Sequence, residues 1–169
     1  MLQKIDIKSI HDNPFSLIDD QWALITAGDE QRYNTMTASW AGLGILWNKP
    51  VATIYVRPQR YTYEFTEKSD YFTLTFFAPG EQREALALCG TKSGREMDKF
   101  AAAGLSVAFA GCGAPYVAEG ELVLVCRKLY AQDLKEGCFV EKNIIDKNYP
   151  ARDFHRMYVG EIVEAWRRK

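Results

Sequence analysis

The stretch NTMTASW at residues 34–40 carries small hydroxyl side chains where a buried strand would carry Val, Ile or Phe. Alternate residues of a strand share one face. One face would therefore carry the hydroxyls of Thr35, Thr37 and Ser39. The other face would carry Asn34, Met36, Ala38 and Trp40. A row of hydroxyls can donate hydrogen bonds to the polar edge of a planar heterocycle and accept hydrogen bonds from it. The alternative interpretation is a threonine-rich strand that faces solvent.

A second polar cluster, RPQRYT at residues 57–62, follows an apolar run. The run ends at Arg57, Pro58 turns the chain, and Thr62 falls in the first turn of a predicted helix. Two arginines, Arg57 and Arg60, together with a hydroxyl and the free N–H groups of a helix start, could bind an anion. The alternative is a turn whose charges are solvated.

A third cluster, TKSGREMDKF, opens a predicted helix at residues 93–103. Ser93 with Glu96 three residues later is a capping-box pattern. Arg95 and Lys99 are four residues apart and would share one helix face, where two cations could hold a phosphate. The alternative is a capped surface helix whose charges balance one another.

The histidines and cysteines predict no metal site. Two histidines, His11 and His155, are too few and too far apart for a His-based site of usual spacing. No two cysteines form a C-x-x-C pair. The four cysteines are Cys89, Cys112, Cys126 and Cys138.

Two of these residues could also have roles outside metal binding. Cys112 lies in a GCG turn that lacks the third glycine of a dinucleotide-binding fingerprint, and nothing local supplies a base to activate its thiol. His155 directly precedes the last predicted strand, where it is either a structural residue or one that approaches a substrate in a shallow site.

Composition narrows the class of protein. The chain has 169 residues, is 47% hydrophobic and 13% aromatic, and carries a net charge of −1. These values predict one globular domain over residues 1–169 and give no electrostatic reason to expect nucleic acid or an anionic membrane as a partner. No apolar run approaches a membrane span of about 20 residues, and the N-terminal sequence has no secretion-signal pattern. We therefore expect a cytoplasmic protein with reduced thiols.

The hydrophobic pattern predicts a mainly β domain. The predicted strands cover residues 22–27, 33–39, 51–57, 71–77, 105–110, 121–133 and 157–166. The predicted helices cover residues 60–68, 81–88 and 93–103. Several strands are separated only by turns, which favours a β-barrel with short helical insertions over a parallel α/β sheet.

Taken together, these segments resemble the FMN-binding split-barrel family of flavin reductase-like proteins, which includes the flavoredoxins. Residues 34–40 resemble the family's flavin-cradling strand, and VRPQRYTYE at 56–64 resembles the turn that meets the FMN phosphate. SGREMDKF at 93–100 resembles the helix that closes over the cofactor, and HRMYVGEIVE at 155–164 resembles the closing strand.

The resemblance implies a Greek-key split barrel and a homodimer with one FMN per subunit near the dimer interface. Thr37 and Ser39, with backbone groups of residues 34–40, would meet the pyrimidine side of the ring. Trp40 or Phe100 would pack on the ring edge. The phosphate candidates are Arg57, Arg60 and Thr62. The residues that would complete the ribityl and phosphate contacts are Ser93, Arg95 and Lys99.

The implied activity is hydride transfer from NADH or NADPH to the flavin, followed by delivery of electrons to an acceptor, as in a flavin reductase or a flavoredoxin-like carrier. His155 is the candidate contact for nicotinamide or for the acceptor. Two alternatives stay open: a non-catalytic module that stores or senses flavin, and a cofactor-free β-barrel binding domain. A pyridoxamine-phosphate-oxidase-like enzyme would share the split barrel, but its motifs are absent.

Overall fold

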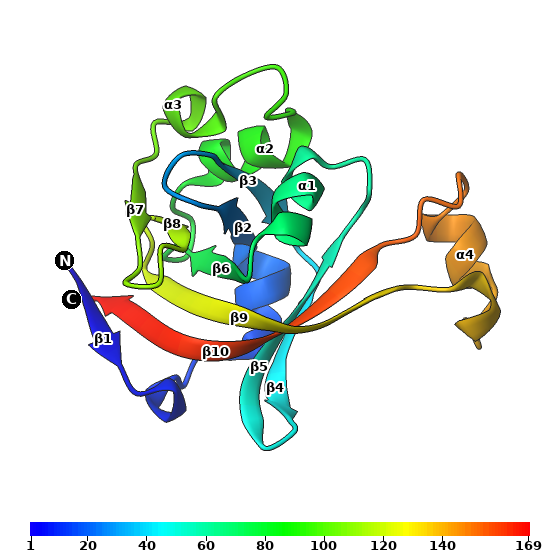
Figure 1. Cartoon of the computed structure of the whole chain (residues 1–169), viewed down its shortest axis with the longest axis horizontal. Helices are drawn as coiled ribbons and strands as arrows, with labels where there is room; N and C mark the ends of the chain where they lie inside the picture. The colour runs from blue at the N-terminus through cyan, green and yellow to red at the C-terminus, as the bar shows by residue number, and fades with distance from the viewer.

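A computed structural model describes all of residues 1–169 and contains ten strands and four α-helices (Figure 1). The strands are β1 (Leu2–Ile5), β2 (Ala23–Gly28), β3 (Tyr33–Ala38), β4 (Ala41–Leu46), β5 (Lys49–Val56), β6 (Tyr71–Phe76), β7 (Val107–Phe109), β8 (Pro115–Val117), β9 (Leu122–Asp133) and β10 (Arg156–Arg168). The helices are α1 (Tyr61–Lys68), α2 (Arg83–Thr91), α3 (Lys99–Ala103) and α4 (Asn143–Asn148). Short 3-10 turns cover Ile7–Ser9 and Glu136–Cys138, and a π-helical segment covers Ser16–Gln21.

One antiparallel sheet of eight strands forms the body of the protein, in the order β3-β2-β6-β9-β10-β5-β4, with β1 added beside β10. Strands far apart in the chain are neighbours, such as β2 with β6 and β5 with β10. Such long connections are typical of Greek-key topology. The predicted fold class, a mainly β split barrel with short helical insertions, is confirmed.

Strand β10 allows the sheet to split and curl. Its first half pairs with β5 and its last residues pair with β1, while β9 follows it along the other edge. Two register shifts interrupt the β9–β10 ladder, one at Val159/Gly160 and one at Ile162/Glu164. Bulges of this kind increase local twist and bend a sheet. A Cβ at Gly160 would lie 2.7 Å from the Phe72 ring, so glycine allows that ring to pack at the bend.

Strand β6 is buried on both faces, although its sequence alternates between apolar residues and threonines. Phe72, Leu74 and Phe76 belong to the main core, yet Thr73 and Thr75 are also fully buried. The hydroxyl of Thr73 donates to the carbonyl of Pro115 in β8, because the β7–β8 hairpin covers this face.

The helices α1, α2 and α3 lie together over the β2–β3 end of the sheet (Figure 1). The helix predicted at residues 93–103 is wrong in its first half, since only Lys99–Ala103 is helical. Asp98 is the N-cap, and its side chain accepts from the N–H groups of Phe100 and Ala101. Ser93 instead accepts from the N–H of Arg95 within a turn, as serine often does outside helices.

Two extensions project from the body: the β4–β5 hairpin, of which only β5 was predicted, and an arm at residues 134–155 that carries α4 and was not predicted (Figure 1). The β4 strand lacks a clear signal because its sequence, AGLGIL, contains two glycines. Strands β1 and β8 were also missed, since each is only three or four residues long. No helix of the protein is long and apolar enough to cross a membrane.

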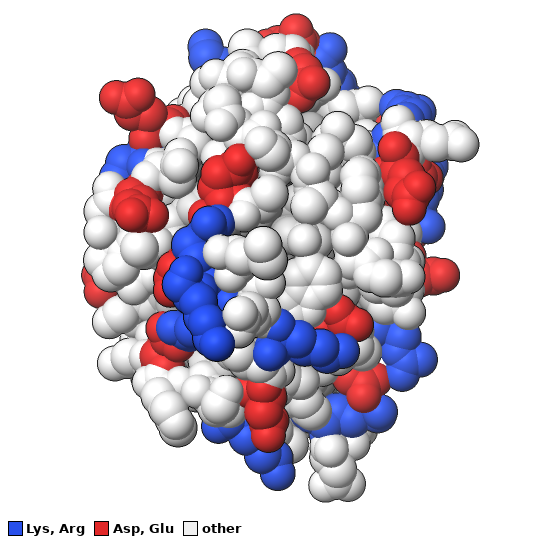
Figure 2. Space-filling model, turned by 90° about the vertical axis from the view of Figure 1, so that its left-hand side faces the viewer, with Lys and Arg blue, Asp and Glu red and all other residues white.

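The chain ends lie side by side, where β1 pairs with the end of β10 (Figure 1). On the face that looks out from this side, basic and acidic side chains are interspersed among uncharged ones (Figure 2). Mixed charge of this kind creates no extended field of one sign.

Candidate functional site

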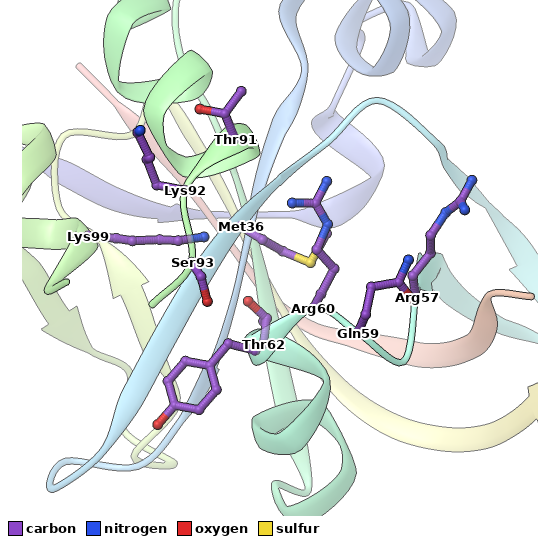
Figure 3. A pocket seen from close by; sticks show the side chains of 10 residues that line it. Met36, Arg57, Gln59, Arg60, Thr62, Thr91, Lys92, Ser93 and Lys99 are labelled. Atoms are coloured by element: carbon purple, nitrogen blue, oxygen red, sulfur yellow. The ribbon is translucent and has the colours of Figure 1, made fainter. Parts of the chain in front are cut away.

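A cavity of about 420 Å³ lies where β3, the turn after β5, the start of α1 and the segment after α2 meet (Figure 3). Most of its lining side chains are cationic or polar. They are Met36, Arg57, Gln59, Arg60, Tyr61, Thr62, Thr91, Lys92, Ser93 and Lys99. Three predicted clusters, separated by tens of residues in the chain, therefore meet at one place.

A second cavity of about 170 Å³ adjoins the first, because both are lined by Met36, Arg57 and Arg60. It is richer in apolar and aromatic groups. Its remaining lining residues are Thr37, Ala38, Ser39, Trp40, Tyr55 and His155. The two cavities form one groove with a cationic end and an aromatic end.

The groove follows the backbone edge of β3 rather than one face of that strand. Consecutive residues from Met36 to Trp40 line the second cavity, although neighbouring side chains of a strand point to opposite faces. Strand β3 is the last strand of the sheet, so no strand pairs with its outer edge. Backbone N–H and C=O groups along such an edge can bond to a ligand.

Two of the three hydroxyls expected to face a heterocycle bond within the protein instead, and Ser39 lines the second cavity. Thr35 is fully buried and its hydroxyl donates to the carbonyl of Ile25 at 3.1 Å. The hydroxyl of Thr37 donates to the carbonyl of Leu86 in α2 at 2.6 Å. Gly90 makes this approach of α2 feasible, since a Cβ there would lie 3.3 Å from the Cβ of Thr37. The hydroxyl face of β3 is therefore the docking face for α2.

Asn34 positions the two loops that form the cationic end. Its side-chain amide donates to the hydroxyl of Thr62 at 2.7 Å, which links β3 to the start of α1. Gly94 packs against the same amide, and a Cβ there would lie 2.1 Å from its Oδ1. Asn34 is buried and holds the groove wall from behind.

The arginines of the second cluster are held in place by different partners. Arg57 is paired with Asp153, donates to the carbonyl of Asn148 at 2.8 Å, and lies over the ring of Tyr149. Arg60 donates to the carbonyl of Gly90 at 2.7 Å. Neighbouring Gln59 also donates to Asp153, at 2.6 Å, and its hydrogen bond together with that of Arg57 holds the pKa of this carboxyl below its usual range.

The cations of the third cluster lie in different environments and do not share a helix face as predicted. Arg95 precedes α3, pairs with Glu64 at 2.6 Å and stacks over Tyr61, outside both cavities. Lys99 is the first residue of α3 and keeps 4% of its surface exposed. Lys92 lines the groove with an exposed side chain, and its ammonium group makes no ion pair or hydrogen bond within the protein.

The Lys99 ammonium group is buried without a carboxylate partner. It donates to the carbonyls of Thr35 at 3.0 Å and Cys89 at 2.8 Å, which joins β3 to the end of α2. Burial lowers the pKa of Lys99 to about 8, and the charge of Arg60 acts in the same direction. The opposing effect of Cys89 is smaller than that of burial.

The aromatic candidates separate in the structure. Phe100 is buried in a second core and packs edge-on against Tyr33, with ring centroids 5.2 Å apart, so it does not line the groove. Trp40 is 47% exposed and lies beside His155, with ring centroids 5.3 Å apart. The aromatic end of the groove is therefore formed by Trp40, Tyr55 and His155.

Of the predicted residues, the structure brings eleven to the groove, and five further lining residues were not selected. The eleven are Met36, Thr37, Ala38, Ser39, Trp40, Arg57, Arg60, Thr62, Ser93, Lys99 and His155. The five are Tyr55, Gln59, Tyr61, Thr91 and Lys92. Four of these five lie within the clusters RPQRYT and TKSGREMDKF, so the clusters carried a signal for them. Tyr55 lies inside an apolar strand pattern, which gave no signal that this residue would line a site.

The curled antiparallel sheet is that of the split-barrel fold class, and its groove lies at the β3 end. Within this class, the chain belongs to the flavin reductase like domain family, whose model matches residues 15–169.

Individual relatives agree with this family. A high molecular weight rubredoxin of Moorella thermoacetica is 30% identical over 118 residues, which is 70% of this chain and 48% of that protein. The chain thus spans about half the length of this curated relative. Two solved structures share the fold: an FMN-binding domain of a flavin reductases-like enzyme from Shewanella baltica (TM-score 0.70, 19% identity, 99% of this chain and 77% of that chain) and the flavoredoxin of Desulfovibrio vulgaris (TM-score 0.69, 21% identity, 99% and 78%).

We predict that the contribution of Lys99 to the free energy of unfolding becomes more favourable as the pH rises above 8. Its pKa of about 8 in the folded state lies below its ordinary value of 10.5, so between these pH values the unfolded chain binds more protons. The unfolding free energy of the wild type should therefore rise relative to that of Lys99→Met by about 1 kcal/mol or more per pH unit between pH 8 and 10. Urea unfolding at several pH values measures this difference, and parallel pH curves for the two proteins would contradict it.

Proposed function

We propose that this protein binds FMN in the groove and acts as an oxidoreductase that takes hydride from NADH or NADPH and passes electrons to an acceptor. The observation that carries the proposal is the union of a cationic, hydroxyl-rich cavity with an aromatic one along an unpaired strand edge. A flavin mononucleotide has a dianionic tail, a polar pyrimidine edge and a flat ring, and the groove supplies suitable groups for each.

The cationic end fits the phosphate and ribityl parts of FMN. Arg60 and the hydroxyls of Thr62 and Ser93 lie around one space (Figure 3), and Lys92 also lines this cavity. No side chain caps the N-terminus of α1, so its first N–H groups remain available there. An anion at this position would interact favourably with both the cations and the helix start.

The strand-edge end fits the ring. Met36 and Ala38 supply apolar surface, the backbone from Met36 to Trp40 supplies donors and acceptors, and Trp40 supplies an aromatic face. When bound, the flavin itself supplies the hydride chemistry. The residues of this edge would hold the ring, and Trp40 and His155 at the same end of the groove would meet a second planar molecule.

The names of two similar proteins support the proposal that the protein is an electron carrier. One solved neighbour is named a flavoredoxin and the Moorella relative is named a rubredoxin, and both names denote electron carriers. The family name supports the flavin reductase form. Both forms use the same groove and differ only in whether electrons leave on free flavin or pass to an acceptor.

The first expected outcome is that the purified protein retains FMN through desalting, with the visible absorption bands of oxidised flavin, and that anaerobic addition of NADH or NADPH bleaches these bands. Stopped-flow absorbance measures the rate. Retained flavin that neither nucleotide reduces would favour the flavin store, and a colourless protein that does not quench FMN fluorescence would favour the cofactor-free barrel.

The second expected outcome concerns Lys92, whose ammonium group has no partner in the protein. Lys92→Met should weaken FMN binding about three- to thirty-fold by removing a charge-assisted contact to the phosphate. Riboflavin, which lacks the phosphate, should bind both proteins equally. Fluorescence titration measures both affinities, with Lys8→Met as a control for loss of a distant exposed lysine. An equal loss of riboflavin affinity would remove the phosphate role.

We also propose that the protein is a homodimer that uses the β4–β5 hairpin. The hairpin tip exposes Ile45 (73%) and Trp47 (55%), and Trp47 lies against the exposed ring of Tyr130. Trp47 and Asn48 form the two-residue turn with φ of 52° and 59°, a left-handed conformation that is unusual for a bulky aromatic residue. An exposed aromatic tip of this kind is typical of an interface anchor.

If the hairpin is that anchor, Trp47→Ser should raise the dimer dissociation constant by about tenfold or more, as for the loss of other buried aromatic anchors. Sedimentation velocity over a range of protein concentrations measures it. Phe15→Ser removes a similarly exposed aromatic side chain from another part of the surface and serves as the control. A wild-type protein that sediments as a monomer at all concentrations would refute the dimer.

A further inference from the structure

His155 occupies an unusual position at the aromatic end of the groove. It is 8% exposed, and its Nδ1 lies 2.8 Å from the phenolic oxygen of Tyr149. Its Nε2 has no hydrogen-bond partner within the protein. This atom is not fully buried. Since His155 lines the second cavity, Nε2 is the ring atom that is open to a ligand there.

Tyr149 is itself held firmly in the arm at residues 134–155. It is buried, it packs against the rings of Phe139 and Phe154, and the guanidinium of Arg57 lies 5.1 Å from its ring centroid. Arg57 in turn is paired with Asp153. The phenol therefore has one orientation, and its only hydrogen-bond partner is His155.

The proton positions in this pair follow from the cost of an unpaired buried donor. Burial raises the pKa of Tyr149, so the phenol carries its proton at neutral pH. Burial, together with the charge of Arg57, lowers the pKa of His155 to about 4, so the imidazole is neutral and carries one proton. The charged groups that act on it are Arg57, Asp153 and Arg60.

Two arrangements of these protons are conceivable. If Nδ1 held the imidazole proton, it would donate to Tyr149, and the buried phenolic proton would have no acceptor, which costs about 1–3 kcal/mol. If the phenol donates to Nδ1, every buried donor is satisfied and the imidazole proton is on Nε2. The second arrangement presents an N–H group to the cavity.

We propose that Tyr149 is a positioning residue that fixes His155 as the Nε2–H tautomer, so that the imidazole donates a hydrogen bond into the second cavity to a carbonyl oxygen of a planar ligand. The identity of the ligand rests on the proposed function. A carboxamide-bearing ring such as nicotinamide, stacked beside Trp40, has such a carbonyl oxygen. The tautomer of His155 depends only on its hydrogen bond with Tyr149.

The tautomer is measured directly by nitrogen-15 NMR of histidine-labelled protein as purified. The chain has only two histidines, so His11→Gln identifies the signals of His155. We expect the Nε2–H pattern at neutral pH in the wild type. Tyr149→Phe removes the hydrogen bond to Nδ1, so we expect the resonance of this unprotonated nitrogen to move downfield, toward that of a ring nitrogen without a donor. Tyr116→Phe, a buried tyrosine packed against Trp166, should leave the signals unchanged.

A wild-type Nδ1–H or doubly protonated ring would overturn the proposal, as would an Nδ1 resonance that Tyr149→Phe leaves unchanged. These outcomes do not require any turnover, so they remain decisive even if NADH and NADPH prove inactive. Failure of the proposed function alone would leave the tautomer as expected and show no reduction of bound flavin.

If turnover is present, Tyr149→Phe should raise KM for the hydride donor about two- to tenfold with kcat changed less, as for one weakened neutral hydrogen bond. In a His155→Ala background the same change should have no further effect, because Tyr149 acts through His155. An undiminished effect of Tyr149→Phe in that background would show that it acts by another route.

Discussion

The outer edge of β3 has no partner strand, and the rest of the site depends on this constraint. An exposed strand edge leaves backbone donors and acceptors unsatisfied, which natural sheets usually cover. Here α2 docks on the hydroxyl face through Thr37, Lys99 bonds the Thr35 carbonyl, and the remaining edge borders the groove. Helix α2 approaches β3 closely at this point, since a Cβ at Gly90 would lie 3.3 Å from the Cβ of Thr37.

The cationic end of the groove depends on two sets of contacts that come from distant parts of the chain. Asn34 ties β3 to the start of α1 through Thr62, and the close approach of Gly94 seats the following segment against the same amide. On the other side, the arm at residues 134–155 anchors Arg57 through Asp153 and Asn148. Each arginine that lines the groove therefore has its orientation set by contacts with the rest of the protein.

Much of the site was accessible from sequence, because its clusters have distinctive composition. NTMTASW, RPQRYT and TKSGREMDKF do meet, and most of their predicted residues line the groove. The errors share one physical cause: a pattern shows which side chains are polar but not which partner each one bonds. Thr35 and Phe100 were expected at the ligand and are buried in the protein, while Arg95 pairs with Glu64 outside the groove. Ser93 and Glu96 formed a good capping pattern, yet Asp98 caps the helix because its carboxylate reaches two N–H groups.

The sequence by itself determined the mainly β class, the positions of most long strands and the three segments that carry the site, because alternation, turn residues and polar clusters are local signals. Only the tertiary structure decided that the groove follows an edge rather than a face of β3, that Lys99 is buried against two carbonyls, and that Tyr149 bonds His155. The edge position of β3 and the bond from Lys99 to Thr35 come from contacts between distant parts of the chain, whereas Tyr149 and His155 are six residues apart in an arm that has no clear sequence pattern. The geometry of the contacts between distant parts depends on sheet order and on the curl at β10, which no local pattern records.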